Sequence, residues 1–178
     1  FLDEFGFDYQ NTRTRQKTMV DYVHSKGLPY VANAWTFHDV ACDNISELPW
    51  GSGDWRYVNF QTYNPTNLAL PRTASDIYLI ENFCYDNTGA LNQWDCQERL
   101  AIIKALNASK HMVLWAEAVL AESSGGVVDM AKIGSLNSLA DVAAYVAANA
   151  LLFDLGMVGI GGYSFGAGGV PVLATLPA

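Results

Sequence analysis

Residues 1–6 read FLDEFG, an apolar run that ends in two acids and a glycine. We interpret this run as the end of a β-strand. Four later stretches are also short and apolar, as strands buried on both faces of a parallel sheet are. They are 28–35 (LPYVANAW), 76–83 (DIYLIENF), 111–119 (HMVLWAEAV) and 157–165 (MVGIGGYSF). Five strands are therefore expected.

Amphipathic helices are expected between these strands. In the first helix, Asn11 or Thr12 is a suitable N-cap and Gly27 is a suitable stop. Its basic residues are expected on the solvated face: Arg13, Arg15, Lys17 and Lys26. Two further helices are expected at about 92–110 and 135–151. Strands that alternate with helices predict β-α-β units and a parallel sheet, so the chain is of the α/β class, either a doubly wound sheet or a (β/α)8 barrel.

Polar residues stand at the expected carboxyl ends of four strands. They are Asp3 with Glu4, Asn33, Glu81 and Glu117. An acid in a core strand is costly unless it is paired or lies at a solvated edge, and barrels carry their active sites at the carboxyl ends of their strands. A doubly wound nucleotide-binding sheet would instead have a glycine-rich turn after its first strand, whereas the turn here is acidic. The pattern favours a parallel (β/α) barrel, or part of one.

Residues 36–75 form a long polar stretch in which His38-Asp39-Val40 is expected to make one helical turn. Loops of this length are usually functional or contain short elements of their own. We expect the stretch to form a rim over the carboxyl ends of the strands. Aromatic side chains there and just before it would stack on sugar rings or, alternatively, simply pack: Trp35, Trp50, Trp55 and Tyr63.

Composition excludes several other classes of protein. Ten Lys and Arg stand against eighteen Asp and Glu, which gives a net charge of −8 without the basic footprint of a nucleic-acid binder. No apolar run is long enough to span a bilayer. The three Cys and three His have no metal-ligand spacing, so neither a metal nor a cofactor is predicted.

The length of 178 residues argues for one domain, residues 1–178. This length is below the roughly 200 residues of the smallest complete barrels, and only about five βα units are visible. The chain also opens inside an expected core strand. We therefore expect a piece of a longer chain, with the first barrel strands upstream of Phe1.

Three segments resemble glycoside hydrolase family 114, the endo-α-1,4-polygalactosaminidases. They are FLDEFG at 1–6, VANAW at 31–35 and YLIENF at 78–83, and the resemblance covers about residues 1–120. It implies a (β/α)8 barrel that acts on a polysaccharide, with Asp3 and Glu81 as the catalytic carboxylates.

The strand-end acids and the resemblance are compatible with two functions. In a glycoside hydrolase, one carboxyl group protonates the leaving oxygen and the other is the base or nucleophile. Glu81 is expected to be the acid because its apolar strand should raise its pKa, Asp3 to be the base or nucleophile, and Glu117 to be a further catalytic candidate. Expected glycan contacts are Glu4, Asp8 and Asn33 together with the four aromatic residues. The alternative is a non-catalytic glycan-binding or structural barrel module of a virion fibre or surface assembly, and both functions predict an extracellular, virion or cell-surface location.

Overall fold

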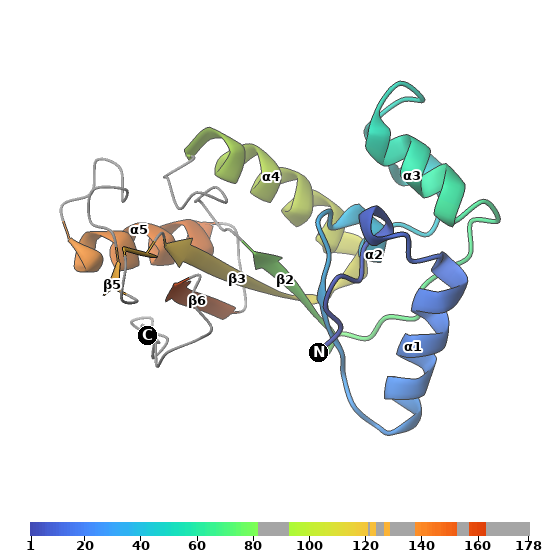
Figure 1. Ribbon diagram of the computed structural model, residues 1–178, viewed down its shortest axis with the longest axis horizontal. Helices are drawn as coiled ribbons and strands as arrows, with labels where there is room; N and C mark the ends of the chain where they lie inside the picture. The colour runs from blue at the N-terminus through green and yellow to red at the C-terminus, as the bar shows by residue number, and fades with distance from the viewer. Residues whose placement is uncertain (82–92, 121, 124–126, 129–137, 153–156, 163–178) are drawn as a thin grey trace. The chain divides into compact units, whose positions relative to one another are not determined.

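The computed structural model describes residues 1–81, 93–120, 122–123, 127–128, 138–152 and 157–162. Helices and strands follow one another along this part of the chain (Figure 1). The chain forms two compact units. The first comprises Phe1–Leu79 and Leu106–Val113, and the second comprises Ile80–Ala105 and Leu114–Ala178.

The first unit contains the N-terminal helices and the first strands. Its elements in chain order are η1 (Phe7–Tyr9), α1 (Arg13–Ser25), β1 (Val31–Asn33), α2 (His38–Ala41), η2 (Ile45–Glu47), α3 (Trp55–Tyr63) and the first residues of β2 (Ile77–Glu81). The caps predicted for α1 are confirmed. The Thr12 hydroxyl accepts a hydrogen bond from the Arg15 backbone N–H at 3.2 Å, and Gly27 follows the helix with a φ of 70°. Only glycine takes that backbone conformation without strain.

Parallel pairing of the first strands is confirmed. In the register of β1 and β2, Val31 lies opposite Ile77 and Asn33 opposite Leu79. Leu2 adds a parallel bridge to Ala32, so the segment before Asp3 runs alongside β1. β1 is shorter than the stretch 28–35 predicted from sequence. One reason is that the Tyr30 N–H bonds to the side chain of Asp76 (3.0 Å) rather than to a neighbouring strand.

The second unit contains the later helices and strands. These are α4 (Gln93–Lys110, whose last turn belongs to the first unit), β3 (Val113–Leu120), β4 (Glu122–Ser123), β5 (Val127–Val128), α5 (Leu139–Leu152) and β6 (Met157–Gly162). β3 and β6 are parallel, and Trp115 lies opposite Met157. Val142 and Val146 of α5 are fully buried, whereas Leu151, at the end of the same helix, is 61% exposed. The short antiparallel pair β4–β5 was not predicted.

The sheet has the strand order β1-β2-β3-β6. Parallel strands combined with helices are compatible with the predicted α/β class. The strands in the described part of the chain do not form a closed barrel. The helical turn expected at His38-Asp39-Val40 is present as α2. Helix α3 was missed, although Asp54 caps it by accepting a hydrogen bond from the Arg56 N–H at 2.8 Å.

Arg13 is buried, which corrects its predicted place on the solvated face of α1. Its side chain is 1% exposed, and its guanidinium lies 5.1 Å from the ring centroid of Phe7 and 5.9 Å from that of Phe60. One guanidinium nitrogen, Nη2, donates to the carbonyl of Cys42 at 2.7 Å. Burial lowers the pKa of Arg13 to about 10. The cation–π contacts and the charge-assisted hydrogen bond offset part of the cost of burying this charge.

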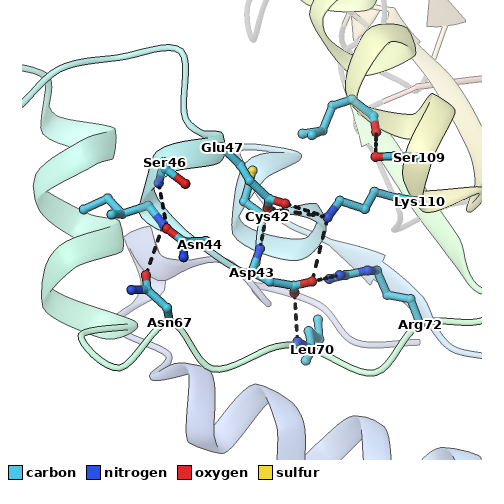
Figure 2. A network of polar contacts seen from close by, with 12 residues as sticks. Cys42, Asp43, Asn44, Ser46, Glu47, Asn67, Leu70, Arg72, Ser109 and Lys110 are labelled. Atoms are coloured by element: carbon cyan, nitrogen blue, oxygen red, sulfur yellow. Dashed lines mark hydrogen bonds and ion pairs between the residues drawn. The ribbon is translucent and has the colours of Figure 1, made fainter.

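A polar network attaches the end of α4 to the loop that follows α2 (Figure 2). Asp43 accepts hydrogen bonds from the Arg72 guanidinium and from the Leu70 N–H (3.1 Å). Lys110 Nζ lies 3.7 Å from the Asp43 carboxylate and 3.1 Å from that of Glu47. Burial alone would raise the pKa of Asp43, but the hydrogen bonds from Arg72 and Leu70 and the charges of Arg72 and Lys110 together lower it.

Candidate functional site

Asp3 and Asn33 meet at the carboxyl end of the first strands. Leu2 pairs with Ala32, so the next residues along each segment, Asp3 and Asn33, also lie level with each other. The Asn33 side-chain amide donates a hydrogen bond of 2.9 Å to the Asp3 carboxylate. Asp3 is exposed and Asn33 is partly buried. Two of the predicted strand-end residues are therefore together and accessible to solvent.

Side chains from α1 and the residues before it hold the turn after Asp3. Glu4 has a φ of 49°, in the left-handed region, which costs a non-glycine residue about 1–3 kcal/mol. Its carbonyl accepts a hydrogen bond of 2.6 Å from the Asn11 amide. The carbonyl of Phe5 accepts another of 2.6 Å from the amide of Gln16, which is fully buried. These contacts fix the backbone that presents Asp3 and the exposed side chain of Glu4.

Asp8 and Asp39 bring two carboxyl groups together beside the same turn. Asp39 is 5% exposed, and its Oδ2 accepts a hydrogen bond of 2.8 Å from the Phe7 N–H. Burial raises the pKa of Asp39 to about 7 and also raises the pKa of Asp8. A carboxylic acid with a pKa near neutrality is suited to donate a proton.

Sequence reasoning missed Asp39 as a candidate and treated it only as part of a helical turn. The signal was present, because in the stretch Phe37–Ala41 only His38 is polar besides Asp39. An acid in such a stretch must find a buried hydrogen-bond partner. One partner is the backbone N–H of Phe7, which is distant in sequence and could not be read from the local pattern.

The aromatic residues predicted to bind sugar differ in their surroundings. Trp35 and Trp55 are 58% and 50% exposed. Trp50 is partly exposed, but the Arg56 guanidinium lies 3.6 Å from its ring centroid. The ring of Tyr63 stacks on the core residue Phe7 with centroids 6.1 Å apart. Trp50 and Trp55 are therefore both at least partly exposed, whereas Tyr63 packs on the core.

The ring of Trp50 is also part of a charged cluster. The Arg56 guanidinium makes two hydrogen bonds to the Asp54 carboxylate, of 2.9 and 2.7 Å. The His38 ring is buried 4.3 Å from the Trp50 ring, centroid to centroid. Burial, followed by the charge of Arg56, lowers the pKa of His38 to about 4. His38 is therefore neutral near pH 7.

The other two predicted catalytic acids are placed by their backbones. Glu81 is the last residue of β2, at the carboxyl end of that strand as predicted. β3 continues to Leu120, so Glu117 lies inside the strand, opposite Gly159, and not at its end as the sequence predicted. The side chains of Glu81 and Glu117 lie outside the described residues.

Within the described residues, no group of three or more His, Cys, Asp and Glu side chains could hold a metal ion. The same residues include no helix that is long and apolar enough to cross a membrane. Comparison of the chain with protein-family models, curated proteins and solved structures finds no match.

Proposed function

We propose that this chain is a glycoside hydrolase that cleaves a polysaccharide with paired carboxylates at the carboxyl ends of (β/α)-barrel strands. The observation that carries the proposal is the contact between Asp3 and Asn33. An exposed carboxylate, oriented by an amide at 2.9 Å, stands where parallel strands end. That edge is where barrel enzymes place their catalytic groups.

In this mechanism Asp3 is the base or nucleophile, and the amide of Asn33 orients it. Glu81 is the general acid that protonates the leaving glycosidic oxygen, with Glu117 as a further catalytic candidate. The separation of the two carboxyl groups would decide the stereochemical outcome: about 5–5.5 Å for retention and about 6.5–9.5 Å for inversion. Glu4, Asp8 and the exposed rings of Trp35 and Trp55 would contact the sugar.

A non-catalytic glycan-binding or structural module of a virion fibre or surface assembly is the second candidate. A specific observation supports the structural form of this candidate. Arg56 covers one face of Trp50, and Tyr63 stacks on Phe7, so these two rings stabilise the protein's own structure. Either function would place the protein outside the cell or on a virion or cell surface.

Hydrolysis is tested with a panel of polysaccharides that includes galactosamine-containing polymers, by measuring the release of reducing ends. Glu81→Gln and Asp3→Asn should each lower turnover by about 10²–10⁴-fold, because acid–base groups contribute on that scale. Asp21→Asn, which alters an exposed acid of α1, is the matched control. If the parent cleaves a polymer and both variants remain fully active, the catalytic assignment is wrong. Binding of a glycan without cleavage, together with lower melting temperatures for Glu81→Gln and Asp3→Asn, would support the second candidate.

A further inference from the structure

The carboxyl groups of Asp8 and Asp39 converge on Gly6. A Cβ atom added to Gly6 would lie 2.2 Å from Asp8 Oδ1 and 3.0 Å from Asp39 Oδ2. The two oxygens therefore approach the same small volume from different segments of the chain, η1 and α2. A larger side chain at position 6 would displace at least one of these carboxyl groups.

One of these oxygens lacks a hydrogen-bond partner. Asp8 Oδ1 is buried and has none among the described residues. Asp39 accepts hydrogen bonds from the Phe7 N–H and from the Thr36 hydroxyl. A buried acceptor without a partner costs about 1–3 kcal/mol, and more when the group is charged. A proton held by one carboxyl group of the pair would remove part of that cost.

The charged groups around the pair are mainly acidic. Arg13 of α1 faces Asp39 and favours its ionised form, whereas Asp8 opposes it. The carboxylate of Glu4 faces Asp8 and opposes the ionisation of Asp8. Burial is the largest influence on both carboxyl groups and acts in the same direction as the acidic neighbours. Two adjacent carboxylates with these neighbours cannot both ionise without repulsion.

We propose that Asp8 and Asp39 hold one proton between them and that this proton fixes the turn that presents Asp3 and Glu4. The Phe7 N–H bond to Asp39 ties the turn to α2 and favours the ionised carboxylate, so the proton acts by removing the repulsion between Asp39 and Asp8. Loss of the proton places two negative charges beside Gly6 and pushes the Asp8 segment away from α2. Asp39 is thus a positioning residue, and its influence on Asp3 as a catalytic group rests on the proposed function.

The experiment is a carbon-13 NMR titration of the aspartate carboxyl groups in the full chain, from pH 3 to pH 9. Asp39→Asn identifies the Asp39 resonance. Asp8→Asn removes the neighbouring charge, and Asp21→Asn is the matched control. In the parent chain, the Asp39 midpoint should lie near 7. It should fall in Asp8→Asn and stay in place in Asp21→Asn.

An Asp39 midpoint near 4, the ordinary value for aspartate, would overturn the proposal. So would a raised midpoint that does not move in Asp8→Asn. If Asp8→Asn does not fold, the titration of the parent chain still tests the coupling of Asp8 and Asp39, because coupled groups share their titration steps. The Asp8 carbon should then shift at the midpoint of Asp39, and independent curves would refute the pair. The titration needs no substrate, so it tests the shared proton independently of the proposed function. If the Asp39 midpoint is raised and coupled to Asp8 but no polysaccharide is cleaved, the proposed function is contradicted and the shared proton is still supported.

Discussion

Replacing Asp39 with asparagine should remove a pH-dependent cost of folding. The amide keeps the shape of the side chain and retains an oxygen for the Phe7 N–H, which donates to Asp39 at 2.8 Å. Burial raises the pKa of Asp39 from an ordinary 3.8 to about 7. The shift is about 3 pH units, and each unit corresponds to ~1.4 kcal/mol, so the full effect is roughly 4 kcal/mol.

The sign follows from proton binding. Because the pKa is higher in the folded state, the folded chain binds more protons than the unfolded chain between about pH 4 and pH 7. The contribution of Asp39 to stability is therefore complete below pH 4 and is lost as the pH rises through 7. Asp39→Asn carries no proton to lose, so its stability relative to the parent should rise by up to roughly 4 kcal/mol across this range.

The assay is urea unfolding followed by tryptophan fluorescence at several pH values from 4 to 8. The difference between variant and parent reports Asp39 together with its coupling to Asp8, because titrating groups that do not interact with Asp39 contribute equally to both chains. Asp21→Asn serves as the control and should not reproduce the slope. A difference that is flat from pH 4 to pH 8 would refute the reasoning, because the Asp39 carboxyl would then titrate alike in the folded and unfolded chains.

Two other substitutions test the packing around the same turn. Gly6→Ala should lower the free energy of unfolding by about 1–3 kcal/mol, because its Cβ would meet Asp8 Oδ1 at 2.2 Å. Gly53→Ala, which has open space around it, should change the free energy of unfolding by no more than about 0.5 kcal/mol. Equal effects of the two substitutions in urea unfolding would contradict the close contact between position 6 and Asp8. Arg13→Ala should cost about 2–5 kcal/mol by removing a buried side chain, whereas Arg15→Ala on the exposed face should stay within about 0.5 kcal/mol. A small loss at Arg13 would mean that the side chain is not buried in solution.

Local chemistry was sufficient to predict much of the first unit. Thr12 and Gly27 set the ends of α1 because capping depends on adjacent backbone groups. The apolar run around Val31 predicted a parallel strand, and its pairing with β2 confirms it. Helix α3 was missed because the turn residues around Gly51 suggested a continuous loop, although the cap Asp54 was visible in the sequence.

Burial imposed by distant segments could not be predicted in the same way. A basic residue on a helix is most simply assigned to solvent, and only the approach of Phe7 and Phe60 makes Arg13 a core residue. The raised pKa of Asp39 depends on burial under a turn that lies far from it in sequence. For the candidate site, the sequence correctly aligned Asp3 with Asn33, since parallel strands bring their carboxyl ends to one edge.

The proposal that paired carboxylates cleave a polysaccharide is tested most directly by one distance, that between the carboxyl groups of Asp3 and Glu81 in a crystal structure of the chain. The account predicts a separation of about 5–10 Å across an open cleft, the range that glycosidases use. A larger separation, or two acids buried in ion pairs with basic side chains, would contradict it.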